Sequence, residues 1–201
     1  EFLLTVGKIQ EALPIAQRLV TLEPQVPIYL HGLVQAYRAM GDWAAALPWA
    51  EREYELGPEL IFMVTEYAQV LWLNGQRAKA REVMSESEVI PPQMRANIET
   101  WFDVHEKGPQ NLTPEQLKIA KADPTIYTYL NQKASFFEML SEKVRLGWWG
   151  DFYTFNVETE HYRDTPEFKN HVKELKLVDY WKKAGWGDSC KPAEDGDFSC
   201  S

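Results

Sequence analysis

A spacing of 34 residues organises the first half of this chain. Glycine, alanine and proline each recur three times at this interval: Gly7, Gly41 and Gly75; Ala12, Ala46 and Ala80; Pro24, Pro58 and Pro92. A period of this length indicates a repeated pair of helices. We expect the glycine in the turn of each pair, because it adopts positive φ without strain, and the alanine where the two helices cross. We expect the proline to end the second helix, because it cannot continue the backbone hydrogen-bond ladder.

The apolar residues between these markers resemble the tetratricopeptide repeat (TPR) pattern. The second copy carries the pattern at Leu30, Leu33, Val34, Tyr37, Ala46, Ala50 and Pro58. Glu53 departs from it, since the pattern usually has a small residue at this late position of the second helix. The resemblance implies an all-α fold: a TPR α-solenoid of antiparallel helix hairpins, with a helical C-terminal extension and an irregular cysteine-bearing tail.

The extent of the period divides the chain into two regions. We expect residues 1–106 to form a TPR array of about three repeats and residues 107–201 to form the helical extension and capping tail. The first turn glycine falls at residue 7, so most of the first helix of that repeat would precede residue 1. The sequence therefore predicts a fragment of a longer protein whose first repeat is truncated.

The C-terminal region is predicted to be helical but without the period. The expected elements are a helix at 94–105, a loop at 107–111, a helix capped by Thr113, one or two helices at 125–147, a helix starting at Thr165, a short helix near 178–181 and a loop from 185 onward. Thr113 and Gln116 have the spacing of a capping box. An aromatic run either fills a core between helices, which is the commoner role, or forms a recognition surface. The run consists of Trp148, Trp149, Phe152, Tyr153 and Phe155.

The segment 166–200 combines a Pro-x-Phe helix start, a Leu-x-x-Tyr-Trp step, a tryptophan-containing loop and two cysteines. Its residues are Pro166, Phe168, Leu177, Tyr180, Trp181, Trp186, Cys190, Pro192, Asp197, Phe198 and Cys200. This combination resembles the end of the TPR region in proteobacterial proteins of the winged-helix transmembrane-regulator and adenylate-cyclase-like types. The resemblance implies the sensory or partner-binding part of a membrane-anchored regulator, located in the periplasm; the alternative location is the cytoplasm. The DNA-binding and cyclase residues of such proteins lie outside this chain, so those activities are not transferred to it.

Cys190 and Cys200 are the two cysteines of the chain. The stretch between them contains Pro192 and Gly196 and is flexible enough to let the two sulfurs meet. Three states are open: a disulfide that staples a loop with little core of its own, a pair of free thiols, or metal ligation. A disulfide would imply an oxidising compartment.

The charge balance and the missing motifs exclude several function classes. Acidic residues outnumber basic ones by 30 to 21, which gives a net charge of −9 and argues against nucleic-acid and anionic-membrane partners. No apolar run approaches the roughly 18 residues of a membrane span. The four histidines are scattered, and no phosphate loop, nucleophile elbow or HExxH motif occurs. We therefore predict no enzymatic activity, no cofactor and no metal for this segment.

The TPR resemblance also implies a candidate binding site, because the first helices of TPR pairs line a concave groove. The family's groove positions hold Ile28, Phe62 and Glu106 here, together with our predicted partner-binding residues His31, Gln35, Arg38, Thr65, Gln69, Trp72, Glu99 and Asp103. Amide groups beside a large aromatic side chain suit a peptide, whose backbone needs hydrogen bonds. If the groove is open, replacing Gln69 and Trp72 by Ala should leave the fold intact and weaken partner binding. The competing expectation is that the C-terminal helices fold back and fill the groove.

Together these features predict an interaction or sensory module that binds a protein or peptide partner through its concave face. Two alternatives stay open. The first is an accessory domain of an adenylate-cyclase-like enzyme whose catalytic domain lies outside this chain. The second is a homodimerisation domain, which would make the protein a homo-oligomer.

Overall fold

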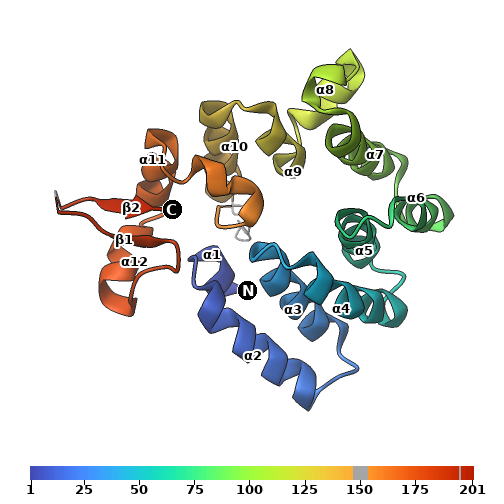
Figure 1. Ribbon diagram of the computed structural model, residues 1–201, viewed down its shortest axis with the longest axis horizontal. Coiled ribbons are helices and arrows are strands. Elements are labelled where there is room, and N and C mark those ends of the chain that lie inside the picture. Colours follow the sequence, from blue (N-terminus) through green and yellow to red (C-terminus); the bar gives the residue numbers. More distant parts are fainter. Residues whose placement is uncertain (147–153, 195) are drawn as a thin grey trace.

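The computed structural model describes residues 1–146, 154–194 and 196–201. Within these residues, twelve α-helices pack as sequential pairs, and a two-stranded hairpin follows them. Figure 1 shows the helices following one another around a ring, with the C-terminal elements beside the first helix. The beginning and the end of the chain therefore lie close together.

Three pairs of helices form the first part of the fold. They are α1 (Phe2–Thr5) with α2 (Ile9–Leu22), α3 (Pro27–Ala39) with α4 (Trp43–Leu56), and α5 (Ile61–Leu73) with α6 (Arg77–Glu86). The turn glycines have positive φ angles of 75° at Gly7, 72° at Gly41 and 78° at Gly75. The alanines Ala12, Ala46 and Ala80 are buried. The role predicted for the glycines is therefore confirmed, and the alanines lie in the core, as a position between packed helices requires.

The role predicted for the prolines is correct for two of the three. Pro24 and Pro58 each lie just beyond the end of a helix, α2 and α4 respectively. Pro92 instead begins a helix, and α6 already ends at Glu86. The first position of a helix suits proline because its missing N–H would have no partner within the helix there. The third pair is therefore shorter than the period predicts, and the next helix starts in a new register.

The C-terminal part consists mostly of short helices. They are α7 (Pro92–Lys107), η1 (Pro109–Asn111), α8 (Pro114–Ala120), α9 (Pro124–Tyr127), η2 (Thr128–Leu130), α10 (Lys133–Arg145), η3 (Val157–Tyr162), α11 (Pro166–Glu174) and α12 (Leu177–Ala184). The predicted capping box is confirmed: Gln116 N donates to Thr113 Oγ1 at 3.2 Å, and Thr113 N donates to Gln116 Oε1 at 3.0 Å. Thr165 caps α11 by accepting a hydrogen bond from Phe168 N.

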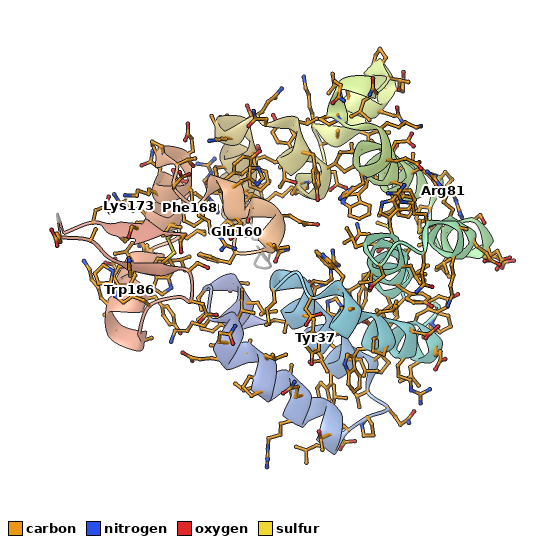
Figure 2. All side chains as sticks on the ribbon, in the orientation of Figure 1. Tyr37, Arg81, Glu160, Phe168, Lys173 and Trp186 are labelled. Carbon is orange, nitrogen blue, oxygen red and sulfur yellow. A yellow bond between two sulfur atoms is a disulfide. The ribbon has the colours of Figure 1, made fainter. Side chains whose placement is uncertain are left out.

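Of the five residues in the aromatic run, Phe155 belongs to the part of the chain that the structure describes. Phe155 is buried, and its ring packs against Phe168 and Trp181 with centroids 5.9 Å away in each case. Phe168 lies in the C-terminal group of helices in Figure 2. Phe155 therefore has the core role, while Trp148, Trp149, Phe152 and Tyr153 lie outside the described residues.

The tail is a hairpin where the sequence predicted a loop. Strand β1 (Cys190–Pro192) pairs antiparallel with β2 (Phe198–Cys200), with Cys190 directly opposite Cys200. A disulfide joins these two cysteines, so of the three states left open the disulfide is the one present. Two three-residue strands are too short to show a period of two in the sequence, and β1 contains a proline, which usually argues against a strand. The all-α expectation is corrected by this hairpin.

The C-terminal segment docks on the turn between α1 and α2. Trp181 Nε1 donates to the carbonyl oxygen of Val6 at 2.9 Å, and Asp188 N donates to that of Gly7 at 2.7 Å. The carboxylate of Asp188 accepts from Gln10 N at 2.8 Å. Lys8 Nζ donates to the carbonyl oxygen of Ala184 at 2.7 Å. These bonds connect residues more than 170 positions apart and close the ring of helices.

The hydrophobic cores also cross the division expected at residue 106. Val6 is buried in the cluster that contains Trp181 and Phe198, from the C-terminal part. Ala120 and Ile126 are buried in the cluster formed mainly by α4 to α7. Each region therefore contributes side chains to the core of the other.

Breaking the disulfide is expected to lower the free energy of unfolding by about 3 kcal/mol, the loop-entropy value for a bridge over this separation. An isolated two-stranded hairpin is marginal in water, so the hairpin depends on its bridge and on the buried ring of Phe198. Urea unfolding followed by circular dichroism, for wild type and for the Cys190→Ser/Cys200→Ser variant, measures the loss. Reduced wild type should match the variant, and an unchanged midpoint after reduction would contradict the prediction.

Candidate functional site

A pocket of about 450 Å³ lies between the first helices of the pairs and the C-terminal part. We call it the central pocket. One wall comes from α3, α5 and α7, and the other from residues 122–124, Lys143 and Asn156. The C-terminal part therefore covers the face on which an open groove was predicted, but it leaves a space there. Polar groups converging on a pocket of this size are typical of a ligand site.

Five of the eight predicted partner-binding residues line this pocket: His31, Gln35, Arg38, Thr65 and Gln69. His31, Gln35 and Arg38 are spaced by four and three residues, which puts them on one face of α3. Thr65 and Gln69 share a face of α5 in the same way. The sequence pattern was sufficient here because both helices keep the register of the period.

Trp72 lies in the core instead of the pocket. It is 4% exposed, and its ring stacks on that of Phe102 with centroids 4.2 Å apart. The guanidinium groups of Arg77 and Arg81 lie over the same ring, at 5.3 and 5.1 Å from its centroid. Figure 2 shows Arg81 between α6 and α7. The expectation that Trp72 anchors a partner in the groove is therefore wrong.

Glu99 and Asp103 also lie away from the central pocket. Glu99 pairs with Arg81 of α6, while Asp103 accepts a hydrogen bond from Gln116 at 2.6 Å and pairs with Lys107 at 2.9 Å. Because α7 starts in a new register at Pro92, it presents other residues to the pocket. These are Met94, Asn97 and Ile98.

A buried polar cluster forms part of the pocket wall. His31 Nδ1 of α3 lies 2.6 Å from Glu66 Oε2 of α5 and 3.2 Å from Glu53 Oε1 of α4. The other oxygen of Glu66 accepts from Gln35 Nε2 at 2.8 Å and from Arg38 at 3.0 Å. Both carboxylates are almost fully buried, with Glu53 1% and Glu66 3% exposed. We refer to His31, Glu53 and Glu66 as the carboxylate–histidine cluster.

Sequence reasoning missed both carboxylates. Glu66 lies next to Thr65 in α5, between the positions that the TPR pattern assigns to the groove. Glu53 did carry a signal, because it is an acid at a position where the pattern has a small residue. A charged residue at such a position must find a partner or cost stability, so it points to a polar site inside the helix stack.

The cluster shifts the pKa values of all three members. Burial alone would lower the pKa of His31, but the adjacent carboxylates of Glu66 and Glu53 outweigh it and raise that pKa to about 10. Burial raises the pKa of Glu53 to about 7, although the contact with His31 acts in the opposite direction. Burial would also raise the pKa of Glu66, but His31 and Arg38 outweigh it and lower that pKa. Shifts of this kind are concentrated at functional sites.

A second buried histidine lies in the C-terminal core. His171 Nδ1 lies 2.9 Å from Ser141 Oγ, and its Nε2 lies 3.1 Å from Thr154 Oγ1. With a hydroxyl at each ring nitrogen and only 2% of the residue exposed, His171 has the environment of a core histidine.

No described helix is both long and apolar enough to cross a membrane. Comparisons with protein-family models, with curated proteins and with solved structures found no match to this chain. The functional conclusion therefore depends on the geometry of the central pocket.

Proposed function

We propose that this chain is a non-catalytic, TPR-type interaction module of a larger regulatory protein, and that the central pocket binds a short segment of a partner peptide. The observation that carries the proposal is the convergence of polar side chains from α3 and α5 on one pocket. The 34-residue period and the positive φ of its three turn glycines support the TPR solenoid. The disulfide supports a location in an oxidising compartment such as the periplasm.

The size and covering of the pocket favour a short ligand segment. About 450 Å³ is within the range of ordinary ligand pockets and holds a few residues. In the part of the chain that the structure describes, Asp123 and Lys143 bound the pocket on the side opposite α3 and α5, across the face on which an open groove was predicted. A peptide end or a tight turn fits this shape better than a continuous helix.

The chemistry of the lining suits a peptide backbone. Gln35, Gln69, Asn97 and Asn156 each carry an amide group, which has both donors and an acceptor for backbone N–H and C=O groups. Phe62 is 42% exposed and provides an apolar surface for a side chain of the ligand. Recognition of this kind combines backbone hydrogen bonds for affinity with one side-chain contact for specificity.

Filling the pocket should abolish peptide binding without changing the fold. Peptides selected from a random phage-displayed library on the purified chain would be synthesised with a fluorophore, and their affinity measured by anisotropy. Thr65→Trp places an indole in the pocket, so we expect binding at least tenfold weaker.

Thr21→Trp on α2 is the matched control. Both threonines donate their hydroxyl to a carbonyl oxygen of their own helix, Thr65 to Phe62 and Thr21 to Gln17, but Thr21 is exposed and lies outside the pocket. The control should bind like wild type. Equal affinity of both variants for every selected peptide, or a selection that enriches none, would overturn the proposal.

A further inference from the structure

Three electron-donor atoms converge at the carboxylate–histidine cluster. His31 Nδ1 and one carboxylate oxygen each from Glu53 and Glu66 all lie within 4.8 Å of one another. They come from α3, α4 and α5, three consecutive helices whose packing fixes their relative positions. Such convergence of one imidazole and two carboxylates from separate helices is the arrangement of a metal-ligand set.

The hydrogen bonds within the cluster leave acceptors in excess. His31 Nδ1 carries at most one hydrogen, yet two carboxylate oxygens face it, at 2.6 and 3.2 Å. The second oxygen of Glu53 is buried and has no hydrogen-bond partner among the described residues. A buried carboxylate oxygen without a partner requires an explanation, and a bound cation is one. A dication in place of the proton on His31 would bind Nδ1 and one oxygen of each carboxylate, and bidentate binding by Glu53 would also occupy its second oxygen.

Two of the three distances between the ligand atoms are within about 1 Å of those around an ion, and the third, between the two carboxylate oxygens, is at most 4.8 Å. Around a tetrahedral Zn²⁺ with bonds of about 2.1 Å, neighbouring ligand atoms lie about 3.4 Å apart. The contact between His31 and Glu53 is already close to that value, and the contact between His31 and Glu66 must open by less than about 1 Å. Since these are side-chain atoms, rotation of the carboxylates supplies the change.

The surroundings hold the ligands in place and leave one side open. Gln35 and Arg38 donate to the far oxygen of Glu66, so the near oxygen keeps its direction toward His31. His31 and Glu66 also line the central pocket, from which water can provide a further ligand. An imidazole nitrogen favours Zn²⁺ over Ca²⁺ and Mg²⁺, which prefer oxygen alone.

We propose that His31, Glu53 and Glu66 bind a divalent transition-metal ion, with Zn²⁺ as the preferred ion, at the wall of the central pocket. This proposal differs from the sequence-based expectation that the segment binds no metal. The ion binds the chain in the absence of any peptide, so the proposal stands independently of peptide recognition.

Isothermal titration of the purified, EDTA-dialysed chain with ZnCl₂ tests the site directly. We expect one strong site per chain. Glu53→Gln keeps the shape of the side chain but removes the charge, and should weaken binding at least tenfold. Glu55→Gln is the matched control on the same helix, since Glu55 is exposed and pairs with Arg52. It should bind Zn²⁺ like wild type.

The absence of a one-to-one site in wild type would overturn the proposal, and so would equal Zn²⁺ affinity in Glu53→Gln and Glu55→Gln. His31→Gln provides a second ligand variant if Glu53→Gln fails to fold, as judged by circular dichroism, and the same tenfold loss is expected. Co²⁺ gives an independent readout, because its visible absorption bands report nitrogen and oxygen ligation. These bands should appear in wild type and Glu55→Gln and be lost in the ligand variants. Stronger binding of Ca²⁺ than of Zn²⁺ would also contradict the assignment.

Discussion

Trp181→Ala is expected to lower the free energy of unfolding by about 3–5 kcal/mol. The residue is 1% exposed, and its ring packs against Phe155, Trp186 and Phe198 at centroid distances between 5.4 and 5.9 Å. Its Nε1–H donates to the carbonyl oxygen of Val6, which joins α12 to the turn after α1. Truncation therefore leaves a cavity and removes the donor to a buried carbonyl group. Urea unfolding followed by circular dichroism measures the loss.

Two variants separate the contributions to this effect. Trp181→Phe keeps most of the ring volume but loses the N–H, so the expected loss is smaller, with about 1 kcal/mol coming from the hydrogen bond. Trp186→Ala removes a neighbouring ring that is partly exposed, beside the hairpin in Figure 2, and should also cost less than Trp181→Ala. Wild-type stability in Trp181→Ala would show that the C-terminal segment does not dock on the first turn as described.

The parts of the fold that the sequence predicted are those with local causes. Gly7, Gly41 and Gly75 have positive φ because a tight turn between helices requires it, whatever lies elsewhere in the chain. The capping box of Thr113 and Gln116 likewise depends on residues three positions apart. Local patterns of this kind predicted the helices of the first three pairs and the start of α8.

The closure of the ring had no such local cause. It depends on contacts such as that between Trp181 and Val6, which are 175 positions apart in the sequence. Phe155 and Val157 pack against the turn glycines Gly7 and Gly41, and no spacing in the sequence connects these segments. Neither expectation for the groove was complete: the C-terminal part lies opposite the face on which the groove was predicted, yet the central pocket remains between them.

The candidate site also contains residues that a local pattern predicted and residues that it did not. His31, Gln35 and Arg38 were predicted because α3 keeps the period, and they do line one pocket. Glu53 was visible as a departure from the pattern, but its partner could not be named, since nothing in the sequence places an acid of α4 beside a histidine of α3. The shift of register at Pro92, which follows the early end of α6, decides which face of α7 meets the pocket.

Trp72→Ala is expected to destabilise the protein by about 3–5 kcal/mol, which is the opposite of the sequence-based expectation that its removal leaves the fold intact. Its indole is buried and stacked on Phe102, and the guanidinium group of Arg81 lies over both rings. Loss of the indole therefore removes core packing. It also removes the ring of a cation–π contact with Arg81, and such a contact contributes about 0.5–1 kcal/mol or more. Thermal and urea unfolding of the variant measure the effect.

Phe62→Ala on the same helix is the control, because Phe62 is 42% exposed at the central pocket and makes an edge contact with His31. Its truncation should change the free energy of unfolding by less than about 1 kcal/mol, since exposed side chains contribute little to the core. The same variant should weaken binding of the selected peptides, whereas the peptide affinity of folded Trp72→Ala should stay near that of wild type. A stable Trp72→Ala variant with weakened peptide binding would reverse the two assignments and place Trp72, not Phe62, at the binding surface.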